Sequence, residues 1–262
     1  MSFSRILIVR ACAVGDFVLN LPALRALARQ HPDCRFTLVG YPEKLALSKI
    51  FLPIEAIHSI ETLPWSDLFA GPWKYSTPLQ FDAAYVWMKA DAFAENLRRS
   101  GVERVFHSAP FPESGHAANH LLRSIDLPAP ELPDLWTPSS DKIIMHPGSG
   151  AAAKCWPHFA GLIEMVRDAV VLIGPADVDF PTNRPSLRGL SLLDVAEELR
   201  QCRCFVGNDS GITHFAAYLG CPTIALFGPT DPRVWGPIGR RVKILWKTQL
   251  ADISVLEVEK LL

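Results

Sequence analysis

The sequence predicts an α/β protein made of two facing Rossmann-like domains with mainly parallel sheets. Two observations lead to this prediction. Apolar runs of strand length alternate with segments of helical periodicity from Arg5 to about Ile125, a pattern typical of a parallel sheet. The same alternation starts again at Ile143, after a segment with four prolines between Leu127 and Asp141. We therefore expect an N-terminal domain over residues 1–130 and a C-terminal domain over residues 131–262.

Composition narrows the possible functions. The 262 residues are 49% apolar with a formal net charge of −1, so nothing favours a nucleic-acid partner. The apolar runs are far shorter than the roughly 18 residues that span a bilayer, and the start does not resemble a signal peptide. The six cysteines lack the spacing of a disulfide framework or a zinc site. We expect a cytoplasmic protein without a bound metal or cofactor.

The first series of elements opens with a buried strand and a turn that leads into a helix. The turn lacks G-x-G-x-x-G, which argues against a nicotinamide dehydrogenase. It offers Asp16 instead, in the first turn of the helix, where a carboxylate either caps the helix or acts as a base. The expected strands are Arg5–Val9, Arg35–Val39, Ala83–Val86 and Arg104–Phe106, and the expected helices are Phe17–Arg29, Pro42–Phe51, Asp91–Arg99 and Gly115–Ile125.

A segment rich in Pro, Trp, Ser and Gly interrupts this series between Glu61 and Gln80. It predicts a surface excursion. Its aromatic side chains either stack on sugar rings or pack the long loop on its own domain, and packing is the favoured interpretation.

The second series opens with a strand over Ile143–Met145 and a glycine-rich turn, His146-Pro147-Gly148-Ser149-Gly150. Backbone N–H groups of such a turn can wrap an anion, and Lys154 follows closely. The remaining expected elements are a helix ending near Arg167, the strands Val170–Ile173, Cys204–Val206 and Thr223–Phe227, helices over Leu190–Leu199 and from Gly211 to about Gly220, and an amphipathic segment over Ser254–Leu262 that packs back across the first domain.

The stretch Asn208-Asp209-Ser210-Gly211 follows a buried strand and begins a helix. Ser210 is suited to cap that helix, and Gly211 lets an anion approach the free N–H groups at the positive end of the helix dipole. His214, one turn later, either reaches the same anion or forms an internal hydrogen bond. Because loops after parallel strands meet at one edge of a sheet, these residues predict a ligand site there.

Asp177-Val178-Asp179 matches the D-x-D string of manganese-dependent glycosyltransferases, which is weak evidence when it stands alone. That class of enzymes is built around a single sheet and lacks the opening strand and loop found here, which argues against a manganese site.

Three segments resemble glycosyltransferase family 9, the bacterial heptosyltransferases. They are I-L-I-V-R-A-C-A-V-G-D, H-P-G-S-G with K-x-W-P, and D-S-G-x-x-H-x-x-A followed by G-P-T-D-P. The resemblance implies the GT-B architecture, with Asp16 as catalytic base and Lys154, which meets the donor diphosphate, as a second catalytic residue. It also implies that a carboxylate from either Asp177 or Asp179 accepts hydrogen bonds from the donor ribose and that Leu190 lies near the adenine pocket. The donor site would comprise Ser149, Gly150, Lys154, Asp177, Leu190, Asp209, Ser210, Gly211 and His214.

The resemblance also implies an inverting, metal-independent transfer from ADP-heptose to a glycolipid such as the lipopolysaccharide core. The protein would then meet its acceptor at the cytoplasmic face of the inner membrane. In the family the region that corresponds to Glu61–Gln80 is longer and carries basic residues, whereas here only Lys74 is basic in that region. Two alternatives stay open: a nucleotide-sugar 2-epimerase of the same architecture, and a non-catalytic nucleotide-sugar binding protein.

Overall fold

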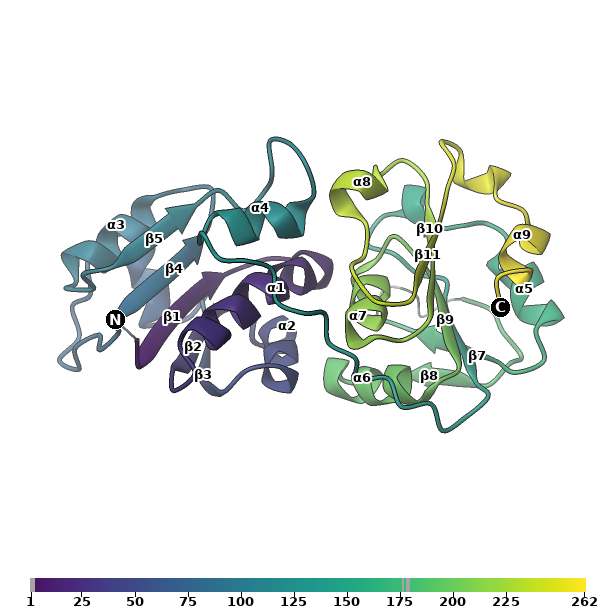
Figure 1. The fold of residues 1–262 in the computed structure, drawn as a ribbon, viewed down its shortest axis with the longest axis horizontal. Helices are drawn as coiled ribbons and strands as arrows, with labels where there is room; N and C mark the ends of the chain where they lie inside the picture. The colour runs from purple at the N-terminus through teal and green to yellow at the C-terminus, as the bar shows by residue number, and fades with distance from the viewer. Residues whose placement is uncertain (1–2, 176, 178–179) are drawn as a thin grey trace. The chain divides into compact units, whose positions relative to one another are not determined.

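The structure, a computed structural model, describes residues 3–175, 177 and 180–262. The chain folds into two compact units (Figure 1). The first holds the residues up to Ala13 and Asn20–Pro130, and the second holds Glu131–Leu262 together with Val14–Leu19. Each unit is a Rossmann-like domain around one parallel sheet.

The first unit contains a five-stranded parallel sheet of order β3-β2-β1-β4-β5. One face is covered by α3 and the short 3₁₀ helix η2, which bury Phe93, Leu97 and Leu68 against Leu7 and Val9. The strands of this series are β1 (Arg5–Arg10), β2 (Arg35–Gly40), β3 (Ile54–Ser59), β4 (Ala83–Trp87) and β5 (Val105–Ser108); its helices are α1 (Val14–Gln30), α2 (Pro42–Leu45), η1 (Ala46–Ile50), η2 (Trp65–Phe69), α3 (Ala92–Arg99) and α4 (Ala117–Arg123).

The second unit contains a six-stranded parallel sheet of order β11-β10-β9-β6-β7-β8. When the strands are numbered within the unit and read from β8 to β11, this order is 3-2-1-4-5-6, that of a dinucleotide-binding fold. Its strands are β6 (Ile143–His146), β7 (Ala169–Ile173), β8 (Ser186–Arg188), β9 (Cys204–Asn208), β10 (Thr223–Phe227) and β11 (Val242–Trp246); its helices are η3 (Ala152–Lys154), α5 (Phe159–Met165), α6 (Leu192–Gln201), α7 (Gly211–Leu219), α8 (Pro232–Trp235), η4 (Leu250–Asp252) and α9 (Val255–Glu259).

The core of this unit lies between the sheet and α5. Phe159, Leu162 and Val258 pack on the inward side chains of the central strands. Helix α9, which we expected to pack across the first domain, instead contributes Val258 to this core and contacts α5. The last helix therefore stabilises the unit that carries the candidate donor residues.

Three strands escaped the prediction: β3, β8 and β11. All three lie at a sheet edge, where one side of the strand stays exposed and the continuous apolar run of a central parallel strand is not needed. The expected helix over Pro42–Phe51 splits into α2 and η1.

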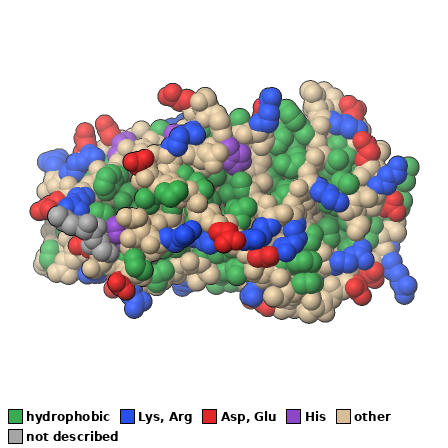
Figure 2. Space-filling view, in the orientation of Figure 1, with side chains coloured by type: hydrophobic (Ala, Val, Ile, Leu, Met, Phe, Trp, Pro, Cys, Tyr) green, Lys and Arg blue, Asp and Glu red, His purple; other side chains and the backbone are tan. Residues whose placement is uncertain are grey.

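On the face drawn in Figure 2, charged side chains of one sign do not form a large patch, because Lys and Arg are interspersed with Asp and Glu. No helix within the described residues is long and apolar enough to cross a membrane. All six cysteines are free thiols, and four of them are buried.

Candidate functional site

The strand order of the second sheet locates its ligand crevice. The chain reverses its winding between β6 and β9, which are neighbours in the sheet. In an open parallel sheet, ligands bind beyond the carboxyl ends of the strands at this switch point. The loops that flank it are the ones after His146 and Asn208, which contain most of the residues expected to bind the donor.

The side chain of Asn208 connects these two loops by hydrogen bonds. Its side chain is fully buried and donates to the carbonyl of Pro147 at 2.7 Å, while its Oδ1 accepts from the backbone N–H of Trp156 at 3.0 Å. Ser149 Oγ adds a hydrogen bond to the carbonyl of Asp209 at 2.8 Å. The glycine-rich loop therefore has a fixed path along the end of β9. The sequence placed Asn208 at this edge but could not indicate its hydrogen bonds, because their partners lie more than 50 positions away along the chain.

Lys154 and Asp209 form an ion pair at this edge. Lys154 Nζ lies 2.6 Å from Asp209 Oδ2, with the carboxylate side chain 8% exposed and the lysine side chain 33% exposed. His214 Nε2 lies 3.7 Å from the other carboxylate oxygen, at ion-pair rather than hydrogen-bond distance. Burial would raise the pKa of Asp209, but hydrogen bonds and the charge of Lys154 lower this pKa to about 2. Asp209 is therefore a buried anion that holds Lys154 at the rim.

His214 faces Asp209 and is nearly buried. The sequence left two roles open for His214, contact with a bound anion or an internal contact, and the structure shows its Nε2 beside Asp209 Oδ1. Its Nδ1 is buried without a hydrogen-bond partner among the described residues.

The N-terminus of α7 opens at the same edge. Ser210 caps the helix, its Oγ accepting from the N–H of Thr213 at 3.4 Å, as its position before Gly211 predicts. The helix ends at Gly220, which adopts a left-handed φ of 95°. Both expected ends are confirmed, and the free N–H groups of the first turn give the edge a positive potential.

A chain of polar contacts links α7 to Asp177. His146 Nδ1 lies 3.4 Å from Ser210 Oγ, and His146 Nε2 lies 3.2 Å from Asp177 Oδ2. The hydrogen bond to His146 lowers the pKa of Asp177 more than burial raises it. A Cβ on Gly148 would overlap the Asp177 carboxylate, so Gly148 leaves the space in which that carboxylate sits.

Gly150 is not needed for packing, because a Cβ there would meet nothing within 4 Å. Its place in the donor site stays a prediction. Asp179, the other acidic candidate, lies outside the described residues.

An apolar pocket of about 410 Å³ adjoins His146 and Gly174. Leu190, Ile212 and Val195 line it, with Arg188 at its margin. Its size and lining suit a flat organic ring, and its position beside Asp177 suits a ribose next to that ring. Leu190, which the resemblance assigns to the donor site, is one of the residues that line this pocket.

Asp16 lies in the first turn of α1, the helix that follows the carboxyl end of β1. The residue that precedes α1 is Ala13, and Asp16 does not cap the helix. Among the residues that the structure describes, nothing forms a hydrogen bond or ion pair with the Asp16 carboxylate. The Asp16 residue is part-exposed.

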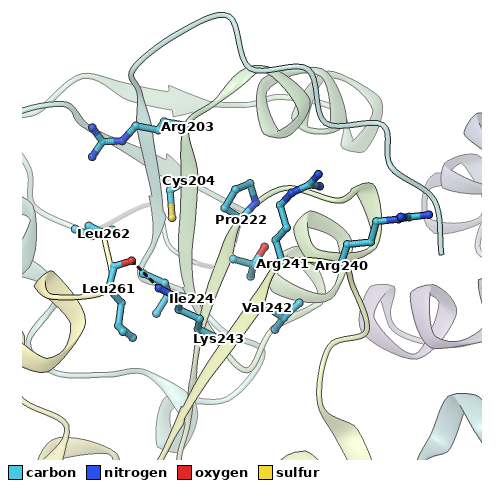
Figure 3. Close-up of a pocket in the computed structure, with 11 residues that line it drawn as sticks. Arg203, Cys204, Pro222, Ile224, Arg240, Arg241, Val242, Lys243, Leu261 and Leu262 are labelled. Atoms are coloured by element: carbon cyan, nitrogen blue, oxygen red, sulfur yellow. Dashed lines mark hydrogen bonds between the residues drawn. The ribbon is translucent and has the colours of Figure 1, made fainter.

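A cavity of about 330 Å³ lies at the opposite, amino-terminal edge of the second sheet (Figure 3). Its cations serve the fold in part: Arg241 forms a two-point ion pair with Asp134 at 2.7 and 2.8 Å, and Arg240 bonds Glu131. These contacts fasten the proline-rich linker to the second unit. The described part of the chain contains no group of three or more His, Cys, Asp or Glu side chains that could hold a metal ion.

Comparison with known proteins agrees with this geometry. Residues 123–261, about half of the chain, match the family model of glycosyltransferase family 9 (heptosyltransferase). The chain belongs to this family. Lipopolysaccharide heptosyltransferase 1 of Pseudomonas aeruginosa is 26% identical over 90% of this chain and 82% of its own length. Lipooligosaccharide heptosyltransferase 2 of Haemophilus influenzae is 34% identical, but the match covers only 41% of this chain and 36% of that relative.

Solved structures support the same fold for this family 9 member. Heptosyltransferase II of E. coli superimposes with a TM-score of 0.79 at 20% identity, covering 98% of this chain and 97% of that one. The E. coli heptosyltransferase WaaC with ADP gives a TM-score of 0.75 at 19% identity, covering 98% of each chain. The expected family and the pair of parallel-sheet domains of the GT-B fold are confirmed.

Proposed function

We propose that this family 9 protein transfers a heptose from ADP-heptose to a saccharide hydroxyl. The observation that carries the proposal is the carboxyl edge of the second sheet, where an apolar pocket, the Asp177 carboxylate and the positive N-terminus of α7 follow one another. The adenine ring would occupy the pocket lined by Leu190, and the ribose hydroxyls would donate to Asp177. The diphosphate would lie between Ser149, Gly150 and the first turn of α7 at Ser210 and Gly211.

Lys154 would neutralise the diphosphate as it leaves. One of its three ammonium hydrogens is directed to Asp209, which leaves two for phosphate oxygens. Each well-placed donor to a developing anion typically contributes ~3–4 kcal/mol of transition-state stabilisation. The transfer would therefore need no divalent cation, and His214, whose Nε2 lies 3.7 Å from Asp209 Oδ1, would help to hold the Asp209 carboxylate in place.

Asp16 would act as the general base. An acceptor hydroxyl oxygen attacks the anomeric carbon, the bond from that carbon to the diphosphate oxygen breaks, and Asp16 takes the hydroxyl proton. A single displacement from the face opposite the diphosphate inverts the anomeric configuration. A carboxylate without hydrogen-bond partners is suited to this role because no contact must be broken before it accepts the proton.

The acceptor we propose is the lipopolysaccharide core, met at the cytoplasmic face of the inner membrane. The names of the matching relatives support this choice, although the matched region covers about a third of several of them.

Calorimetric titration with ADP, UDP and GDP in the presence of a chelator tests the donor site. We expect ADP to bind at least tenfold more tightly than UDP or GDP, because the pocket has an apolar lining that suits the adenine ring. Equal affinities, or binding that is lost in chelator, would contradict the proposal. ADP-heptose consumed without an acceptor, yielding a free epimerised sugar, would indicate an epimerase instead.

A further inference from the structure

The aromatic segment between β3 and β4 forms a pocket in the first unit. The pocket has a volume of about 450 Å³, within the usual range of roughly 300–1,000 Å³ for small-ligand sites. It opens near Arg5, the first residue of β1, and Glu55, the second residue of β3. Arg5 begins β1, whereas Asp16 follows the carboxyl end of that strand in the chain.

Packed aromatic rings form its walls. Trp65 is nearly buried and contacts Trp73, Phe81 and His58, with ring centroids 5.4, 6.5 and 5.3 Å apart. Trp73 and Phe81 are only part-buried, so they contribute ring surface to the pocket. Trp73 Nε1 donates to the carbonyl of Thr77 at 2.7 Å, which fixes the ring in place. These rings therefore pack the loop on its own domain, and they also line a cavity.

The polar groups of the pocket include an ion pair that carries no net charge. Arg5 Nη2 lies 3.2 Å from Glu55 Oε2, and both side chains are 42% exposed. The guanidinium also lies 5.7 Å from the centre of the Phe81 ring. Burial lowers the pKa of His58, so this side chain is neutral at pH 7 and can donate or accept. The hydroxyl of Thr37 adds another such group.

The charges that line the pocket indicate which class of ligand it can bind. A phosphate or carboxylate would need an excess of cations, and a cation would need an excess of carboxylates; here Arg5 and Glu55 cancel. A purely apolar ligand would cover both ions without replacing the water they lose. A sugar ring satisfies all the groups, since its C–H face packs on aromatic rings and its hydroxyls both donate and accept.

We propose that this pocket binds a neutral saccharide unit, with the sugar ring against Trp73 and Phe81 and its hydroxyls paired with Glu55, Arg5 and Thr37. The site is distinct from the donor site of the second unit and does not depend on the proposed transfer. A glycan held there stays attached to the first unit whether or not nucleotide is bound.

Titration of the full chain with D-glucose, D-galactose, D-mannose, N-acetylglucosamine and a manno-heptose tests the proposal, read by tryptophan fluorescence and saturation-transfer NMR. We expect saturable binding of at least one of these sugars, unchanged by saturating ADP. Glu55→Gln, which keeps the side-chain volume, should weaken this binding at least fivefold. The matched control is Glu198→Gln, which removes a carboxylate paired with Lys142 at 3.1 Å in the second unit and should leave sugar binding unchanged.

Three results would overturn the proposal. They are the absence of saturable binding by every sugar, binding that Glu55→Gln does not weaken, and fluorescence changes produced by adenosine or inorganic phosphate in place of sugars. Melting temperatures of the variants, measured in parallel, separate a lost site from a lost fold.

Discussion

Replacing Lys154 with Met tests whether the buried Asp209 anion depends on its lysine partner. The pKa of Asp209 falls from 3.8 to about 2 on folding. At about 1.4 kcal/mol per pKa unit, ionised Asp209 contributes roughly 2–3 kcal/mol to the free energy of unfolding. Lys154 makes the shortest contact with the carboxylate, at 2.6 Å, so its loss should cost ~1–2 kcal/mol at pH 7.

The pH dependence gives this prediction a second readout. Because folding lowers the pKa of Asp209, its contribution is complete above the unfolded pKa near 4 and declines as the pH falls toward 2. At pH 3 about half of it should remain. Urea unfolding of the wild type and of Lys154→Met at pH 7 and pH 3 measures both quantities.

A matched control separates the buried pair from an ordinary surface charge. Lys142 also pairs with a carboxylate, at 3.1 Å, but both side chains of that pair are much more exposed than Asp209, so Lys142→Met should cost under about 1 kcal/mol. Equal stabilities of Lys154→Met and wild type at pH 7, or a difference that does not shrink at pH 3, would refute the reasoning.

Two further changes test the loop that holds the nucleotide. Gly148→Ala should weaken ADP binding at least tenfold, because the new Cβ takes the space of the Asp177 carboxylate, whereas Gly150→Ala should leave ADP binding unchanged. Equal affinities of the two variants in a calorimetric titration would contradict the role of Gly148 in placing Asp177. Asn208→Ala should lower the free energy of unfolding by ~2–4 kcal/mol, because Pro147 and Trp156 lose buried hydrogen-bond partners; a loss under about 0.5 kcal/mol in urea unfolding would show that water replaces the amide.

The central strands of both sheets were predictable because burial on two faces demands continuous apolar runs, as in Ile6–Val9 and Thr223–Phe227. The caps of α7 were equally readable, since Ser210 and Gly220 act through local backbone chemistry. The edge strands β3, β8 and β11 lack such a continuous apolar run.

The site was less predictable where it depends on distant pairs. The resemblance indicated Lys154 and Asp209 as separate members of the donor site, while their ion pair joins residues 55 positions apart. His146 and Gly148 were part of a recognised motif, yet their relation to Asp177 exists only once β6 and β7 lie side by side. The Arg5–Glu55 pair in the aromatic pocket likewise forms only when β1 and β3 lie in one sheet.

The most direct test of the account is the transfer reaction itself, measured with ADP-heptose and a lipopolysaccharide core acceptor in chelator, for the wild type and Asp16→Asn. The account predicts product of inverted anomeric configuration from the wild type. For Asp16→Asn it predicts a kcat lower by at least about 100-fold with ADP affinity unchanged, because the variant keeps the donor site and loses only the base. Full activity of Asp16→Asn, or product with retained configuration, would contradict it.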